Sequence, residues 1–110
     1  KMFVYSNDVQ VEDLGDGVSR KILAYSENGM SVEVSFEEGA VGPLHHHYHE
    51  QFTYVLSGAF EFTIGDETKI VKAGDLLYKA PDVPHGCRCL KAGKLLDTFV
   101  PMREDFLKLS

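Results

Sequence analysis

Residues 60–71 read FEFTIGDETKIV, two short strand patterns on either side of a turn. Phe60, Phe62 and Ile64 alternate with polar residues, which is the pattern of a β-strand with one buried face. Gly65-Asp66-Glu67 supplies the turn signal, and a second short run at 69–71 follows it. This stretch predicts a β-hairpin.

The same alternation recurs on both sides of the hairpin, at 30–36 and at 95–100. Ten glycines separate such short runs along the chain, and this spacing is typical of an antiparallel sandwich or barrel. No window of about a dozen residues carries a helical stripe. The best helical candidate is the tail, residues 103–109, as a short helix. The predicted fold class is therefore all-β.

The composition is that of one globular domain spanning residues 1–110, with 44% apolar and 25% charged residues. A formal net charge of −6 disfavours nucleic acid and anionic membranes as partners, because either needs a basic face. The apolar runs are far shorter than the roughly 20 residues of a membrane span. No basic-then-apolar signal segment opens the sequence, so we expect a cytoplasmic protein.

All five histidines fall in two places, a cluster at 45–49 and a single residue at 85. In an extended segment alternate side chains share a face, so His45, His47, His49 and Gln51 are expected to point one way and His46 the other. Two imidazoles at this spacing can reach one cation at about 2.1 Å. His85 follows a turn-rich segment, 80–84, and is expected to begin a strand facing them. From the residues alone, a solvated surface cluster is the alternative.

The flanking residues resemble the two motifs of the cupin superfamily. Residues 39–58 match the first motif, with glycines at both ends, histidines at 45 and 47, and Gln51 where glutamate is usual. Residues 74–89 resemble the second motif around His85, with Ala80, Asp82 and Cys89 in place of its usual Pro, Gly and Asn. The resemblance implies a double-stranded β-helix, or jelly-roll, barrel that holds a divalent metal in its mouth.

Carried over residue by residue, the resemblance implies the metal ligands His45, His47, Gln51 and His85. Glu50 is a stronger base but faces away from the histidines and breaks the spacing, and His49 is an alternative or auxiliary ligand. His46 is expected to be exposed. Three imidazoles and an amide leave the ion its full +2 charge, suited to carboxylate or enolate oxygen. The ligand types fit Ni, Zn, Fe, Mn or Co, and no organic cofactor is expected.

Residues 95–107, LLDTFVPMREDFL, resemble the ending of the KdgF-type small cupins, the pectin-degradation proteins. Those proteins are understood to open the ring of 4,5-unsaturated uronates released by pectate and alginate lyases. The product is a linear keto-deoxy uronate, so the reaction is an isomerisation. The resemblance thus implies a metal-dependent enzyme whose partner is a small anionic sugar acid.

The same resemblance implies roles for four residues near the metal. Asp97 and Arg103 are the implied catalytic pair: the first as acid and base, the second as the clamp on the uronate carboxylate. Phe99 is expected to pack on the sugar and Thr53 to line the pocket. Without the family, Asp97 is an exposed strand carboxylate and Phe99 a core residue. Arg103 then forms a salt bridge with Glu104 or Asp105.

Two other functions fit a cupin metal site. One is a small metal-dependent dioxygenase or lyase, and the other is a non-enzymatic module that binds a sugar or small acid. Gln51 argues against the first and the lone domain against the second. A homodimer is also expected, with an amino-terminal strand at 2–5 pairing across the interface.

Overall fold

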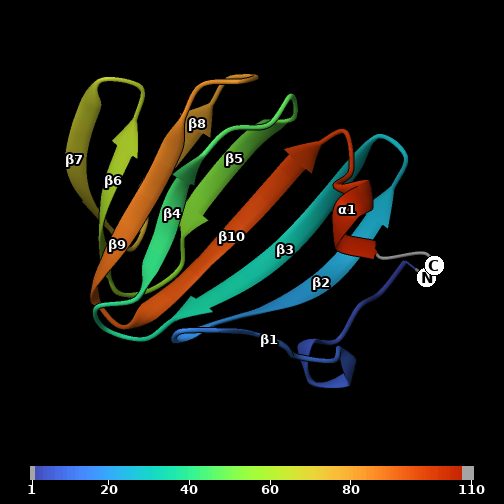
Figure 1. The fold of residues 1–110 in the computed structure, drawn as a ribbon. Coiled ribbons are helices and arrows are strands. Elements are labelled where there is room, and N and C mark those ends of the chain that lie inside the picture. The colour runs from blue at the N-terminus through green and yellow to red at the C-terminus, as the bar shows by residue number, and fades with distance from the viewer. Residues whose placement is uncertain (1, 108–110) are drawn as a thin grey trace.

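The computed structural model describes residues 2–107, which form ten strands, one 3₁₀ turn and one short helix (Figure 1). In chain order these are η1 (Ser6–Asp8), β1 (Glu12–Gly15), β2 (Val18–Ser26), β3 (Gly29–Phe36), β4 (Val41–His45), β5 (Glu50–Val55), β6 (Ala59–Ile64), β7 (Glu67–Lys72), β8 (Leu76–Lys79), β9 (His85–Lys91), β10 (Gly93–Val100) and α1 (Glu104–Leu107).

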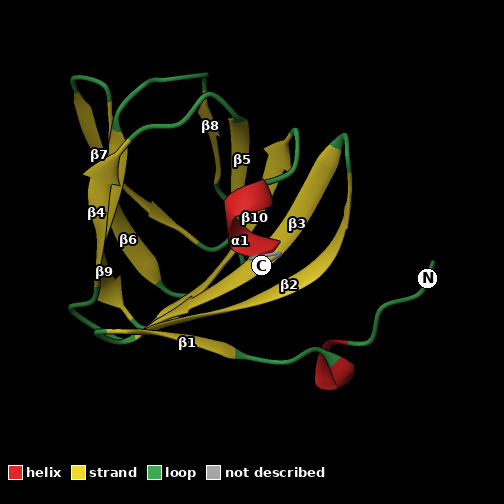
Figure 2. Ribbon diagram, turned by 45° about the vertical axis from the view of Figure 1, so that its right-hand side comes forward, coloured by secondary structure: helices red, strands yellow, loops and turns green. Residues whose placement is uncertain are grey.

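The strands form two facing sheets, as the turned view in Figure 2 shows. The larger sheet has the order β1-β2-β3-β10-β5-β8 and the smaller one the order β4-β9-β6-β7. All strand pairs are antiparallel. After β3 the chain passes repeatedly from one sheet to the other, so many paired strands are distant in sequence. This is the predicted all-β jelly-roll barrel. The short helix α1 lies across its open end, close to β10 and β3.

The strand predictions agree closely with the structure. The hairpin at 60–71 is β6 and β7, joined through Gly65 and Asp66, with Ile64 opposite Glu67. The alternating runs at 30–36 and 95–100 lie within β3 and β10. The predicted tail helix is confirmed at 104–107, and its remaining part, 108–109, lies outside the described residues. Within residues 2–107, no helix is long and apolar enough to cross a membrane.

The predicted amino-terminal strand is not formed within this chain. Residues 2–5 belong to none of the strands, and their side chains are exposed, with Met2 at 99% and Phe3 at 79%. An extended conformation persists at Tyr5, where φ is −98° and ψ 125°. Residues 2–5 therefore belong to no strand ladder of the described chain.

The core fills the space between the sheets with every second side chain of the inner strands. The larger group of buried apolar residues packs between the sheets and consists of Phe36, Ala40, Val55, Phe60, Phe62, Leu77, Cys89 and Leu95. A smaller group lies toward α1 and consists of Met30, Val32 and Phe99. The rings of Phe36 and Phe60 meet edge to face with centroids 5.3 Å apart. This packing leaves the α1 end of the barrel for polar side chains.

Two links between strands approach each other closely at Gly58 and Gly93. A Cβ on Gly58 would lie 2.4 Å from the Lys91 carbonyl oxygen, and one on Gly93 would lie 2.1 Å from that of Ser57. Gly58 also adopts a left-handed φ of +81°. Only glycine allows the link between β5 and β6 to pass so close to the link between β9 and β10. The last glycine of the first motif is thus explained by close backbone approach.

We predict that Gly93→Ala destabilises the fold by about 1–3 kcal/mol or more, because its methyl group would overlap backbone that cannot move away alone. Urea denaturation measures the free energy of unfolding. Gly29→Ala is the matched control, since its Cβ would lie 3.4 Å from the nearest atom, the Phe99 carbonyl oxygen. Equal stability of the two variants would contradict the close approach described above.

Candidate metal centre

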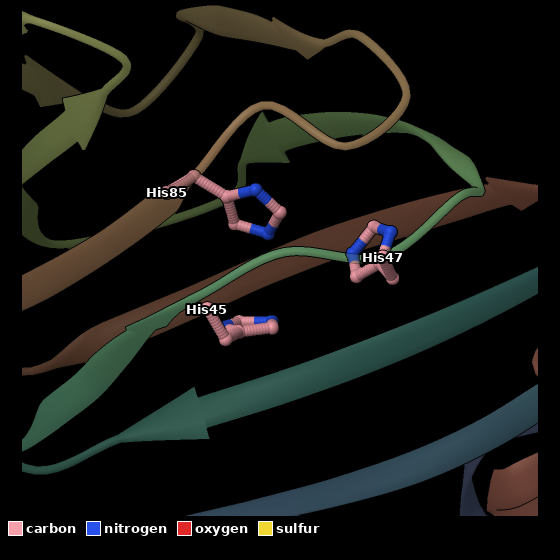
Figure 3. A group of neighbouring side chains, drawn as sticks. All are labelled: His45, His47 and His85. Carbon is pink, nitrogen blue, oxygen red and sulfur yellow. The ribbon is translucent and has the colours of Figure 1, made fainter.

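Three histidines converge at the mouth of the barrel (Figure 3). His45 ends β4, His85 begins β9, and His47 lies in the loop between β4 and β5. One ring nitrogen from each lies within 4.8 Å of those of the other two. The ring of His85 is 4.6 Å from that of His45 and 4.9 Å from that of His47, measured between centroids. Such a cluster has the size of a site for one cation.

Backbone pairing brings these residues together. His45 is the direct partner of His85 in the β4–β9 ladder, after a register shift between Gly42 and His45. β4 approaches so closely that a Cβ on Gly86 would lie 2.9 Å from the Gly42 carbonyl oxygen. Glycine at position 86 is therefore needed beside the ligand at position 85.

The turn before β9 also holds the loop that carries His47. Asp82 donates its backbone N–H to the His47 carbonyl oxygen at 2.7 Å. Its φ is +62°, in the left-handed region that favours glycine, the usual residue of the motif here, and that aspartate tolerates better than most residues. The departure from the family motif at Asp82 therefore preserves the turn.

Each of the three imidazoles has the same nitrogen engaged by the backbone. Nδ1 of His45 lies 2.8 Å from the Pro43 carbonyl oxygen. Nδ1 of His47 lies 3.1 Å from the carbonyl oxygen of His49, and Nδ1 of His85 lies 3.0 Å from that of Val83. A carbonyl only accepts, so Nδ1 carries the proton and Nε2 presents its lone pair in the neutral ring. Histidines that bind metals are commonly oriented in this way.

The environment keeps two of these rings neutral. Burial, together with the nearby positive charge of Lys79, lowers the pKa of His85 to about 3. Burial and the positive charge of Arg103 lower the pKa of His47. The Nε2 atom of His85 is buried without a hydrogen-bond partner among the described residues. An unpartnered, buried lone pair is unfavourable unless a cation satisfies it.

Gln51 supplies a fourth donor atom. Its Oε1 lies 3.0 Å from Nε2 of His47. Because Nδ1 of His47 donates to a carbonyl, two lone pairs face each other across this distance, and a cation shared between them resolves the conflict. The four side chains thus fit a divalent metal with nitrogen and oxygen ligands.

A cavity of about 200 Å³ opens beside this donor set. Its walls come from β1, β2, β3, β4, β5, β10 and the tail, and the lining residues are Leu14, Arg20, Val32, Val34, His45, Gln51, Asp97, Phe99, Arg103 and Phe106. A larger hollow of about 570 Å³ lies between residues 3–9 and β2, away from the histidines. Of these two hollows in the described chain, the smaller one combines imidazole and amide donors with a carboxylate and two guanidinium groups.

Three residues implied by the family resemblance line this cavity. Asp97 and Phe99 are buried on the inner face of β10, at 8% and 3% exposure. Arg103 follows β10 and lies over the Phe99 ring, with its guanidinium carbon 5.1 Å from the centroid. It also donates two hydrogen bonds to Asp105, at 3.0 and 2.9 Å. The salt bridge that the sequence left as an alternative is present, and Arg103 lines the cavity as well.

Thr53 differs from the expectation that it lines the pocket. Its side chain is fully buried beneath Gln51 and does not reach the cavity. It accepts a hydrogen bond from Nε2 of Gln51 at 3.3 Å and donates one to Asp97 at 2.6 Å. Thr53 does share a strand face with Gln51, as expected. It lies deeper in the barrel than Gln51, which covers it.

The remaining polar residues of the motif lie outside the three-histidine cluster. His49 does not join the cluster: the chain bends at 48–49, and its Nε2 lies 3.1 Å from the Met102 carbonyl oxygen. His49 is nevertheless buried on the inner side, as expected, with its ring centroid 5.3 Å from that of His47, but it is not one of the three converging histidines. Glu50 faces outward, where it accepts a hydrogen bond from the Tyr78 hydroxyl. His46 is exposed, as expected, 3.6 Å from an Asp82 oxygen.

The sequence reasoning missed three residues near the site, Arg20, Phe106 and Lys79. Arg20 on β2 lines the cavity, and both it and Arg103 contact the Phe106 ring, with guanidinium carbons 3.9 and 4.2 Å from the centroid. Lys79 is 3% exposed, opposite Gln51 in the β5–β8 ladder, with its ammonium 4.6 Å from the Phe62 centroid. The available signal was positional, since Lys79 shares a strand face with the buried Leu77.

Comparison with known proteins agrees with this geometry. The cupin domain family matches residues 32–99. The pectin degradation protein KdgF of Dickeya dadantii (strain 3937) is 40% identical over 109 residues, covering 97% of this chain and 99% of that protein.

Two solved structures resemble the whole barrel. The KdgF structure from Halomonas sp. superimposes with a TM-score of 0.92 at 33% identity, over 96% of this chain and 98% of that one. An RmlC-like cupin from Shewanella frigidimarina NCIMB 400 gives a TM-score of 0.94 at 38% identity, over 96% of both chains. The chain therefore belongs to the cupin family and, within it, to the KdgF-type small cupins.

Proposed function

We propose that this protein is a metal-dependent isomerase that opens the ring of 4,5-unsaturated uronates from pectin or alginate breakdown, giving linear keto-deoxy uronates. The observation that carries the proposal is one small cavity beside the three-histidine cluster, in which two neutral donors, His45 and Gln51, meet a carboxylate and two guanidinium groups. The similarity to pectin degradation protein KdgF over nearly the whole chain supports it.

The proposed metal ligands are Nε2 of His45, His47 and His85 and Oε1 of Gln51. They suit one divalent ion, Ni, Zn, Fe, Mn or Co. When bound, the ion supplies a Lewis acid that stabilises negative charge on substrate oxygen. An isomerisation transfers no electrons and no group, so the reaction needs no organic cofactor.

The cavity suits one anionic sugar ring. Its volume of about 200 Å³ corresponds to roughly seven water molecules, the space of a single monosaccharide rather than an oligosaccharide. Arg20 and Arg103 place positive charge at its wall although the protein carries a formal net charge of −6. Guanidinium groups favour carboxylates because their planar donors can bind both oxygens. Phe99 offers a ring face for an apolar sugar surface.

In the proposed mechanism, Asp97 moves the protons. The ring form is a hemiacetal whose ring oxygen is bonded to an alkene carbon. Asp97 accepts the proton of the anomeric hydroxyl as the bond between the anomeric carbon and the ring oxygen breaks, which releases an aldehyde and leaves the electron pair on the enolate. Asp97 then returns the proton to the adjacent carbon, so atoms and charge balance. Thr53 holds the Asp97 carboxylate through its 2.6 Å hydrogen bond.

We further propose a homodimer and a cytoplasmic location. Residues 2–5 expose four apolar side chains, and the backbone is extended at Tyr5, which suits pairing with a second copy. Cys87 and Cys89 are free thiols, and burial raises the pKa of Cys87 to about 11. Unreactive reduced thiols fit a reducing compartment.

Removing one imidazole tests the ligand set. We predict that His45→Ala or His85→Ala loses most of the bound metal and the ring-opening activity, because two imidazoles and an amide hold a divalent ion weakly. Metal content after dialysis, measured by atomic emission, checks the first effect. A full metal complement in either variant would rule out this ligand set.

The neighbours Gln51 and Glu50 provide a matched pair for the same experiment. Gln51→Ala should lower metal content or turnover, whereas Glu50→Ala should be nearly silent because Glu50 lies on the outer face with Tyr78. The opposite ranking would mean that the β5 register places the wrong residue inward.

The activity itself is tested by adding metal-loaded protein to an unsaturated uronate and following the loss of its ultraviolet enol-ether absorbance. Wild-type protein should catalyse this loss. Asp97→Asn should slow turnover by roughly 10²–10⁴-fold, the usual effect of removing a positioned acid or base. The fold should be unchanged, because asparagine keeps the shape, and turnover is expressed per bound metal ion. Binding of uronate without turnover by wild type would favour the non-enzymatic alternative.

Arg103→Lys keeps the charge but loses the planar fork. We predict that it raises KM more than it lowers kcat, since the substrate carboxylate would lose one of two hydrogen bonds. Arg88→Lys, at an exposed position of β9, is the control. If Arg103 served only its ion pair with Asp105, both kinetic constants would stay at wild-type values and stability would fall by at most about 1 kcal/mol.

A further inference from the structure

Thr53 links the carboxylate of the site to one of its proposed metal ligands. It lies on β5 directly opposite Asp97 on β10, and its side chain is completely buried. Its hydroxyl oxygen is 2.6 Å from Oδ1 of Asp97 and 3.3 Å from Nε2 of Gln51. The Gln51 amide in turn places Oε1 3.0 Å from Nε2 of His47. Hydrogen-bonding atoms therefore run without interruption from Asp97 to the histidines.

The direction of each hydrogen bond in this row is determined. A carboxylate only accepts, so the single hydroxyl proton of Thr53 points to Asp97. The hydroxyl oxygen then has only lone pairs left for Gln51, and it must accept from the amide NH₂ group. The amide oxygen is thereby turned toward His47. In the opposite orientation, two oxygens without a proton between them would face each other in a buried place, which is costly.

We propose that Thr53 is a positioning residue that fixes the Gln51 amide so that its oxygen, and not its nitrogen, faces the metal. The inference rests on the proposed ligand set. An amide NH₂ group is a donor with no lone pair for a cation, so only one of its two orientations can coordinate. A glutamate would present an oxygen in either orientation. A glutamine ligand therefore requires a partner that fixes its orientation, and Asp97 provides this through Thr53.

The test is a double-mutant cycle read by metal affinity. Apo-protein is titrated calorimetrically with Ni²⁺ for wild type, Thr53→Val, Gln51→Glu and the double variant. Thr53→Val keeps the shape but removes the hydroxyl, and it should weaken Ni²⁺ binding by about 10-fold or more, as is usual for partners of metal ligands. In the Gln51→Glu background the same change should cost less than about threefold, because a carboxylate needs no orientation. Thr53→Ser should restore wild-type affinity.

Thr63→Val is the matched control, since Thr63 pairs only with Thr68 on the exposed hairpin in the described part of the chain. It should leave Ni²⁺ affinity unchanged. Equal losses from Thr53→Val in both backgrounds, or no loss with Gln51 present, would overturn the positioning role while leaving the ligand set intact. If wild-type protein itself binds neither Ni²⁺ nor Zn²⁺, the ligand set is wrong and the inference falls with it.

Discussion

The candidate site depends on the pairing of β4 with β9. That ladder places His45 opposite His85 at the open end of the barrel, and the preceding turn fastens the loop of His47 to the same place. The pairing is possible because Gly86 has no side chain to separate the strands. Two segments some forty residues apart thus meet with their imidazole nitrogens less than 5 Å apart. The remaining polar side chains of the site are arranged around this contact.

The polar side chains of the site need hydrogen-bond partners, and the backbone and neighbouring side chains provide them. Backbone carbonyls take the Nδ1 protons of the three histidines, and Thr53 lies between Gln51 and Asp97. Among the described residues, two buried side-chain nitrogens have no hydrogen-bond partner: Nε2 of His85, in the three-histidine cluster, and Nδ1 of His49, outside it. Partnered atoms hold the side chains in place, and the unpartnered Nε2 of His85 is available to the proposed cation.

Charge is distributed unevenly between the surface and the cavity. The protein is acidic overall, yet Arg20 and Arg103 line the cavity and Lys79 is buried against Phe62 below it. Burial lowers the pKa of His47 and His85, and the positive charges of Arg103 and Lys79, respectively, add to this effect, which keeps the lone pairs of these rings available. The cations that line the cavity would favour an anionic ligand. Asp97 is the carboxylate among the residues that line this cavity, and the proposed mechanism assigns proton transfer to it. The same electrostatic arrangement suits the proposed metal, substrate and chemistry.

Local sequence pattern determined the strands and the fold class. Alternation with a period of two predicted β3, β6 and β10, because it is a property of neighbouring residues. The resemblance to the cupin motifs implied His45, His47, His85 and Gln51 as ligands, and the structure brings the three histidines together. Contacts between distant segments were decided only by the tertiary structure. At the bend of 48–49, Nε2 of His49 meets the Met102 carbonyl oxygen instead of joining the cluster, and covering by Gln51 placed Thr53 beneath the cavity. The helix α1 brought Phe106 against two arginines. Periodicity tells which face a side chain occupies, but depth within the barrel and partners across it depend on how the sheets pack.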